Sequence, residues 1–141
     1  MRITLCLLVS IISLSLSGQS VVGVWKTVDD VDGLDKSHLE LKEVDGKLQG
    51  KIIKLLDSAE GDKCLECEGD KKNAPLVGME IIWNMKNKNG TYDGGKILDP
   101  KTGKVYKCKI ALGDDPDELK VRGYIGFSLM GRTQTWYRVD N

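Results

Sequence analysis

The sequence predicts an all-β protein that closes into an eight-stranded antiparallel up-and-down barrel. Apolar and polar residues alternate in successive segments of strand length, as they do in half-buried strands. Most links between these segments have the length of hairpin turns, and the chain carries 16 glycines to build them. No window shows the 3.6-residue apolar spacing of an amphipathic helix. An open sheet of eight strands would leave two unpaired edges and one exposed apolar face, so we expect closure.

The first three expected strands are residues 22–28, a segment around Leu39 and Leu41, and residues 48–55. The two leucines alternate with charged residues, which indicates a strand with one buried face and one solvent-exposed face. Asp45-Gly46 follows as a hairpin turn, because Asp and Gly tolerate the positive φ that such turns need.

The middle of the chain predicts two more strands, residues 79–85 and 92–98, joined by a turn at 88–90. A further turn is expected at 99–103, where Pro100 is placed for a type I or II bend. The expected inward row of the first of these strands is Met79, Ile81, Trp83 and Met85.

The last three expected strands are residues 106–112, 119–127 and 133–139. The inward rows of the first two are expected to be Tyr106, Cys108, Ile110 and Leu112, and then Leu119, Val121, Gly123, Ile125 and Phe127. A β-sandwich is the alternative fold. It is less favoured because a Greek-key sandwich needs long crossovers, and only residues 57–75 are long enough to serve as one.

Residues 1–18 are expected to form a secretory signal peptide, followed by a single barrel domain at residues 19–141. Arg2 precedes an apolar stretch at residues 3–16, and small residues follow it. That stretch is shorter than the about 20 apolar residues a membrane anchor needs. We therefore expect an exported protein, periplasmic or extracellular in a bacterium, that does not span the membrane.

The balance of charge and the single histidine argue against several classes of function. Lys and Arg total 21 and Asp and Glu total 21, so the net charge is zero. Electrostatic binding of nucleic acid or anionic lipid by the chain as a whole is therefore not expected. The chain has one histidine, His38, which we interpret as an exposed structural residue. No motif supplies a nucleophile, a base and an orienting group together. The sequence thus predicts a protein that is not an enzyme and needs no metal or other cofactor.

Cys64 and Cys67 stand in a Cys-x-x-Cys motif within the long link. In an exported chain a local disulfide that staples this loop is the first expectation. Thiol–disulfide exchange is the alternative, but the motif lies among carboxylates, which disfavour a thiolate. A bridge from Cys108 to one of the pair is also open, although its inward phase suggests a small buried apolar residue.

Several short motifs follow one another along the chain, including Gly23-Val24-Trp25, Gly95-Lys96-Ile97-Leu98-Asp99-Pro100, Gly103-Lys104-Val105-Tyr106 and Gly131-Arg132-Thr133-Gln134-Thr135-Trp136. In this order they resemble the DUF2147 family of bacterial secreted proteins. The resemblance spans the chain after the expected signal peptide, and it implies no assigned activity. Cys108 is a departure, because we do not associate that position with a family-wide cysteine.

A Gly-x-Trp on the first strand with an arginine near the end of the last is also similar to the calycin pattern of lipocalins. That resemblance implies that Trp25 closes one end of the barrel under Arg132 or Arg138. An arginine over an indole is attractive in its own right.

Two functions follow as expectations. The first is binding of a small apolar or amphipathic ligand inside the barrel. The second is a structural or interaction module of the cell envelope whose core is filled, and periodicity alone does not separate the two. The candidate ligand-binding residues are Trp25, Trp83, Arg132, Thr135, Trp136 and Arg138.

Overall fold

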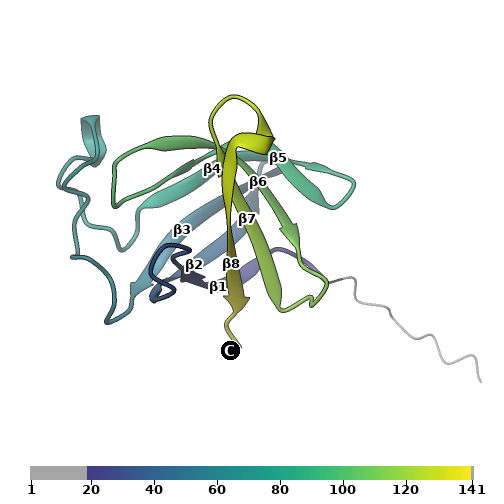
Figure 1. The fold of residues 1–141 in the computed structure, drawn as a ribbon, viewed down its shortest axis with the longest axis horizontal. Helices are drawn as coiled ribbons and strands as arrows, with labels where there is room; N and C mark the ends of the chain where they lie inside the picture. The colour runs from purple at the N-terminus through teal and green to yellow at the C-terminus, as the bar shows by residue number, and fades with distance from the viewer. Residues whose placement is uncertain (1–18, 141) are drawn as a thin grey trace, which may run out of the picture.

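Eight strands hydrogen-bond in chain order and close into a barrel (Figure 1). The computed structural model describes residues 19–140, so the expected signal peptide lies outside the described residues. The strands are β1 (Gly23–Val28), β2 (Asp35–Val44), β3 (Lys47–Leu55), β4 (Glu80–Lys88), β5 (Thr91–Leu98), β6 (Val105–Leu112), β7 (Glu118–Tyr124) and β8 (Gly131–Arg138). Every neighbouring pair is antiparallel, and pairing between β1 and β8 closes the ring. The predicted up-and-down barrel is confirmed, and the β-sandwich alternative is wrong.

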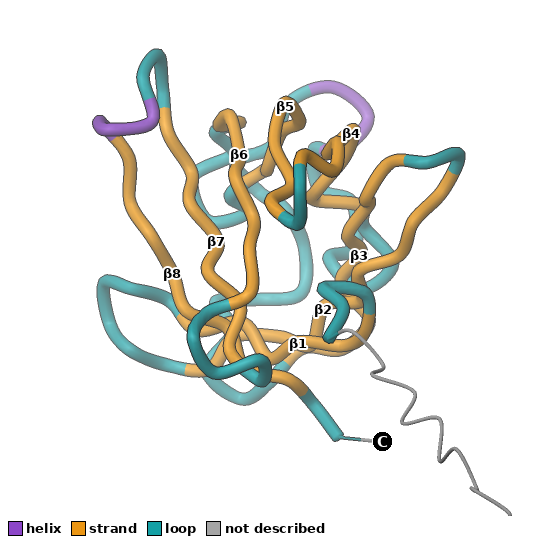
Figure 2. The backbone as a smooth tube through the Cα atoms, turned by 90° about the vertical axis from the view of Figure 1, so that its right-hand side faces the viewer, coloured by secondary structure: helices purple, strands orange, loops and turns teal. Residues whose placement is uncertain are grey.

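The links between strands fall into two groups, at opposite ends of the barrel. In Figure 1 the long β3–β4 loop lies at the left and the β4–β5 and β6–β7 turns lie at the right, and Figure 2 shows the strands as a ring. Because consecutive strands run in opposite directions, the loops after β1, β3, β5 and β7 meet at one end, which we call the mouth. The links after β2, β4 and β6 meet at the other, which we call the closed end. The two short 3-10 helices, η1 (Gly69–Lys71) and η2 (Ser128–Met130), lie in the loops of the mouth.

Large apolar side chains fill the closed end. Trp25 has no exposed surface, and its indole nitrogen donates a hydrogen bond of 2.8 Å to the Val21 carbonyl. The fully buried residues of the strands are Trp25, Leu39, Leu41, Leu48, Ile82, Met85, Cys108, Ile110 and Leu119. Burial of apolar surface on this scale is the main stabilising contribution to such a fold.

The alternation predicted for β4 is wrong at Trp83. Ile82 and Met85 are both fully buried, although an unbroken strand would point them to opposite faces. Asn84 lies between them with φ of 59°, a left-handed conformation that Asn tolerates and that interrupts the alternation. Trp83 pairs directly with the exposed Lys96, so its side chain faces outward.

The inward row predicted for β7 is correct at its start and wrong at its end. Leu119 and Val121 are buried. The strand ends at Tyr124, and Ile125 and Phe127 lie in the following loop, exposed by 66% and 79%. Gly126, with φ of 74°, turns the chain between them and breaks the extended backbone.

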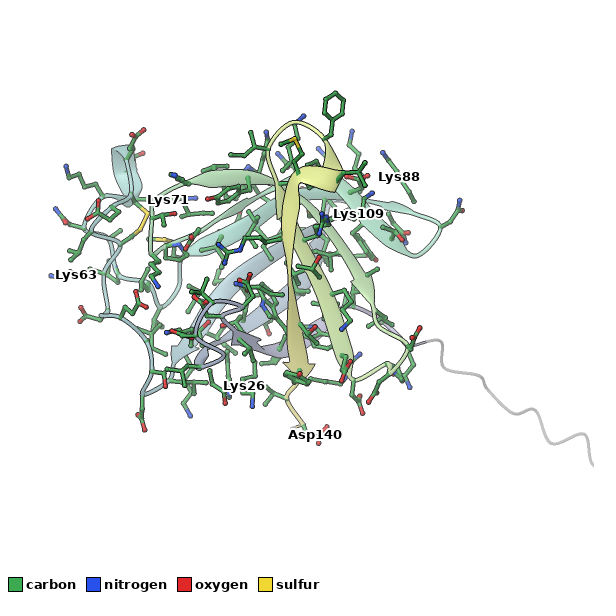
Figure 3. The ribbon with its side chains drawn as sticks, in the orientation of Figure 1. Lys26, Lys63, Lys71, Lys88, Lys109 and Asp140 are labelled. Atoms are coloured by element: carbon green, nitrogen blue, oxygen red, sulfur yellow. A yellow bond between two sulfur atoms is a disulfide. The ribbon has the colours of Figure 1, made fainter. Side chains whose placement is uncertain are left out.

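The long loop between β3 and β4 is stapled by the expected disulfide between Cys64 and Cys67 (Figure 3). The Sγ of Cys64 lies 3.4 Å from the Pro100 carbonyl oxygen, in the β5–β6 turn. Gly103 of the same turn, with φ of 72°, packs so closely on the Glu66 backbone that a Cβ atom there would overlap it. The loop is therefore docked on the barrel through a glycine contact.

Cys108 is a free thiol with no exposed surface, as its inward phase predicted. Burial, helped by the charge of Asp93, raises the pKa of this thiol to about 12. Among the described residues, no helix is long and apolar enough to cross a bilayer.

Candidate functional site

A cavity of about 520 Å³ occupies the mouth half of the barrel and opens between its loops. Apolar side chains from most strands and from the long loop surround it: Ile52, Leu55, Leu76, Ile81, Ile97, Leu98, Val121 and Trp136. Trp136 is 2% exposed and forms part of the cavity wall. The lumen is thus packed at one end and hollow at the other.

Two buried hydroxyl groups stand in this apolar wall. Thr27 of β1 and Ser37 of β2 both line the cavity, and their side-chain oxygens lie 2.8 Å apart. The backbone amide of Ser37 also donates to the Thr27 oxygen, at 3.1 Å. Because each hydroxyl has a partner, the pair keeps its polarity buried without a large free-energy cost.

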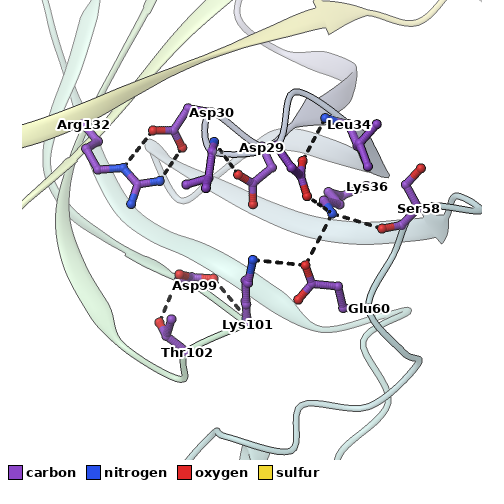
Figure 4. Close-up of polar contacts among 12 residues, drawn as sticks. Asp29, Asp30, Leu34, Lys36, Ser58, Glu60, Asp99, Lys101, Thr102 and Arg132 are labelled. Atoms are coloured by element: carbon purple, nitrogen blue, oxygen red, sulfur yellow. Dashed lines mark hydrogen bonds and ion pairs between the residues drawn. The ribbon is translucent and has the colours of Figure 1, made fainter.

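A chain of polar side chains leads from the rim of the mouth into the cavity. The Arg132 guanidinium donates two hydrogen bonds to Asp30, from Nε at 2.8 Å and from a terminal nitrogen at 2.6 Å (Figure 4). The Gln134 amide donates to the same carboxylate at 3.0 Å, and the Trp136 indole donates to the Gln134 oxygen at 2.8 Å. Arg132 holds the pKa of the Asp30 carboxyl well below its usual range, at about 2. The carboxylate therefore stays ionised throughout the neutral range.

A second ionic cluster ties three loops of the mouth together (Figure 4). The Lys36 ammonium lies 2.7 Å from Asp32 and 3.5 Å from Glu60, and it donates to the Ser58 carbonyl at 3.1 Å. Glu60 is in turn 3.1 Å from the Lys101 ammonium of the β5–β6 turn. Hydrogen bonding to Asp32 raises the Lys36 pKa, and hydrogen bonding to Glu60 raises the Lys101 pKa. The cluster fixes the rim of the mouth around the cavity opening.

Three of the candidate residues lie on β8, where alternation places them on opposite faces of the strand. Arg132 and Trp136 line the cavity, at its rim and in its wall. Thr135 faces the outside of the barrel, where its hydroxyl accepts a hydrogen bond of 2.8 Å from the Lys120 ammonium.

The other three predicted residues do not line the cavity. Trp25 and Arg138 meet at the closed end, where the guanidinium carbon lies 4.3 Å from the indole centroid. Of the two arginines left open by the sequence, Arg138 is therefore the one over Trp25. Trp83 lies on the outer face of β4, with the Lys71 ammonium 4.4 Å from its ring centroid.

Most of the polar groups at the mouth could not be predicted from the sequence. Asp30, Lys36 and Glu60 stand at strand ends or in loops, where alternation carries no information. The partner of Arg132 is 102 positions away in the sequence. One signal was available for Gln134, because alternation places it on the same face as Trp136.

The described residues do not include a metal centre. Among residues 19–140, no group of three or more His, Cys, Asp or Glu side chains lies where it would hold a metal ion. The charged groups named around the mouth are held in ion pairs. The arrangement is suited to holding an apolar body and to hydrogen bonding a polar end.

Comparison with known proteins supports this architecture. A solved structure, protein HP1028 from the human pathogen Helicobacter pylori, described as belonging to the lipocalin family, is similar with a TM-score of 0.77. The sequences are 21% identical, over 88% of this chain and 86% of that chain. This likeness shows that the fold is a lipocalin-like barrel. No curated protein matches the sequence. The model of the DUF2147 family, described as an uncharacterized protein conserved in bacteria, matches residues 23–138. The chain therefore belongs to the DUF2147 family.

Proposed function

We propose that this protein is an exported, non-enzymatic carrier that holds a small apolar or amphipathic molecule in the mouth half of its barrel. The observation that carries the proposal is the cavity of about 520 Å³. Pockets that bind small molecules have volumes of about 300–1,000 Å³ and are mostly apolar with a few placed polar groups. Both features are present in this barrel.

The layout of the cavity favours an amphipathic ligand with its apolar part inside. Most of the cavity wall is apolar, and its Thr27 and Ser37 hydroxyls already bond each other. The rim carries Arg132, Asp30, Lys36 and Lys101 in ion pairs. A polar head at this rim can exchange hydrogen bonds with these groups and stay partly in water, which avoids burying unpaired charge.

The positions of the three tryptophans provide a direct test. Trp136 lines the cavity, whereas Trp83 lies outside the barrel and Trp25 is sealed under Arg138. A long-chain fatty acid brominated in its acyl chain, which quenches indole fluorescence on contact, should therefore quench mainly Trp136. We expect saturable quenching in the wild type and in Trp83→Phe, and its loss in Trp136→Phe.

Comparison of the acid with its methyl ester tests the role of the rim. Tighter binding of the acid would place the carboxylate near the cations of the mouth. Equal binding would indicate that the apolar wall dominates. Absence of saturable quenching by either probe would contradict the carrier function, as would equal quenching in Trp83→Phe and Trp136→Phe. Native mass spectrometry of protein purified from its own host is a separate test, because a carrier is expected to retain its ligand and the spectrum would identify that molecule.

The alternative is an interaction module of the cell envelope, and it predicts no retained molecule. A filled lumen would support it, but the barrel is filled only toward Trp25 and Met85. The cavity is the observation by which the carrier function is favoured.

A further inference from the structure

The loop between β7 and β8 brings four exposed large apolar residues together in one short segment. Residues 125–130 carry no charge, and four of the six are large apolar residues. Ile125, Phe127, Leu129 and Met130 are exposed by 66%, 79%, 90% and 76%. Figure 1 shows this loop projecting from the barrel at the top of the view. Large exposed apolar patches of this kind mark interaction sites.

We propose that the 125–130 loop docks the protein on an anionic lipid bilayer, by inserting its apolar side chains at the level of the headgroups. The inference goes beyond the carrier function, because it concerns where the barrel loads or releases its ligand. It depends on three observations: the apolar loop, the cations beside it, and the position of the loop at the cavity mouth.

Cations line the outer wall next to the loop. The Lys107 ammonium of β6 donates a hydrogen bond of 3.4 Å to the Gly126 carbonyl, within the loop itself. Lys107 pairs directly with Lys96 of β5, and Lys109 pairs directly with Arg122 of β7, so all four share the outer face. Figure 3 shows Lys109 on this wall below the projecting loop.

The balance of charge on this wall is positive, although the whole chain is neutral. The outward side chains of β5, β6 and β7 include five cations, namely Lys96, Lys107, Lys109, Lys120 and Arg122. Their acidic neighbours on the same face are Asp93, 4.0 Å from Lys109, and Glu118, 3.8 Å from Lys120. A cationic patch beside an apolar tip complements anionic headgroups over apolar chains.

The acid-rich loop between β3 and β4 lies on a different side of the mouth (Figure 1). It contains Asp57, Glu60, Asp62, Glu66, Glu68 and Asp70. Its carboxylates would be repelled by an anionic surface, so the barrel is expected to approach lipid with the β7–β8 side. The uneven distribution also explains how a chain of zero net charge can bind lipid locally.

A lipid surface fits the loop better than a protein partner does. Stable protein interfaces use about 20–30 residues a side with close shape complementarity. The loop offers a projecting tip of six residues, flanked by long flexible lysines. A bilayer needs no matching surface, because apolar side chains dissolve individually in its boundary region.

The loop also connects the lipid surface to the cavity. Ile125 and Met130 belong both to the exposed loop and to the cavity lining. An amphipathic molecule leaving the bilayer at the docked loop would therefore meet apolar side chains up to the cavity. Phe127 and Leu129 do not line the cavity, so they can be changed without altering it.

Vesicle flotation with residues 19–141, which contain the whole closed barrel, tests the proposal. We expect binding to phosphatidylcholine vesicles with about 30% phosphatidylglycerol, and much weaker binding to phosphatidylcholine alone. Phe127→Ser/Leu129→Ser should weaken binding by at least about tenfold, because each substitution removes the favourable free energy of transferring an apolar side chain from water into the bilayer. Lys107→Gln/Lys109→Gln should weaken binding only to the anionic vesicles.

Matched controls exist on the opposite wall of the barrel. Val44→Ser/Ile53→Ser removes two exposed apolar residues, and Lys51→Gln/Lys54→Gln removes two exposed cations of β3. Both controls should bind vesicles like the wild type. Circular dichroism and thermal unfolding check that each variant is folded.

Several outcomes would overturn the inference. They are no binding to the anionic vesicles, equal loss in the test and control variants, or a wild-type dimer in solution that the Phe127/Leu129 variant abolishes. The last result would assign the loop to contact between copies. Quenching of Trp136 by the brominated probe should persist in the Phe127/Leu129 variant, so failure of docking is distinguishable from failure of the carrier function.

Discussion

The guanidinium carbon of Arg138 lies 4.3 Å from the centroid of the Trp25 ring, and the two residues pair directly across the β1–β8 seam. The same guanidinium donates to the Ser20 and Pro116 carbonyls, at 2.9 and 3.1 Å, and to the Asp117 carboxylate at 3.2 Å. One side chain thus covers the buried indole and joins both neighbouring segments to the last strand. The end of the chain is thereby part of the barrel's closure.

Replacement of Arg138 should destabilise the barrel measurably. Arg138→Ala is expected to lower the free energy of unfolding by about 2–4 kcal/mol, because it removes charge-assisted hydrogen bonds and the contact with the indole. The neighbouring β1–β8 pair gives a control, since Lys26 lies 5.8 Å from the Tyr137 ring and its ion pair with Asp35 is exposed. Lys26→Gln should change stability by less than about 1 kcal/mol. Urea unfolding measures both, and equal effects would contradict the role of Arg138.

Gly103 should be far more sensitive to alanine than a glycine of similar backbone. Gly103 and Gly90 have φ of 72° and 90°, but only Gly103 faces another backbone, that of Glu66. Gly90→Ala should cost about 1–2 kcal/mol from its left-handed conformation alone. Gly103→Ala adds a backbone overlap, and we expect a cost of about 2–5 kcal/mol together with faster proteolysis in the long loop. A similar cost at both positions would show that the loop is not docked through Gly103.

The thiol of Cys108 should be unreactive in the folded protein. Full burial and a pKa raised to about 12 leave almost no thiolate at pH 8. A chromogenic disulfide reagent should detect no thiol in folded residues 19–141 and a single thiol after unfolding without reductant. Three thiols after unfolding would mean that the disulfide between Cys64 and Cys67 is absent.

Acid should weaken the contact between β8 and the β1–β2 loop. The Arg132 guanidinium lowers the Asp30 pKa from 3.8 to about 2. The ionised carboxylate therefore contributes stability above pH 3.8, and that contribution is lost as the pH falls from 3.8 toward 2. Asp30→Asn should lower stability at pH 7 by about 1 kcal/mol, and the difference from wild type should shrink below pH 3.

The exposed Asp114 provides a control for that experiment. Asp114→Asn should leave the difference from wild type near zero at each pH, because this exposed side chain forms no ion pair with another described residue. Urea midpoints of the three proteins between pH 7 and pH 2.5 decide the question. A constant difference between wild type and Asp30→Asn would contradict the assignment.

The barrel could be predicted because the features that specify its strands and turns lie within short stretches of sequence. Leu39 and Leu41 alternate with charges, and turns such as 88–90 and 99–103 carry residues that suit positive φ or a bend. The failures have local causes as well. In β4 the apolar run Ile81-Ile82-Trp83 fits either phase, and only the backbone at Asn84 decides between them.

The candidate site was harder to predict, because it depends on partners that are distant in the sequence. Arg132 was a candidate by residue type, but its carboxylate partner is Asp30, at the other end of the chain. Glu60 and Lys101 come from two different loops. Alternation assigns a residue to one face of a strand, whereas these contacts depend on how the loops fold over the mouth.

The closed end of the barrel has a practical use in the laboratory. Arg138 holds Ser20 beside the last strand, so both ends of the described chain leave the barrel opposite its opening. A capture tag fused after residue 141 would project away from the cavity, and a sensor surface coated through that tag would present every opening to the injected sample. Ligands and vesicles can therefore be assayed on one immobilised preparation without the attachment blocking either.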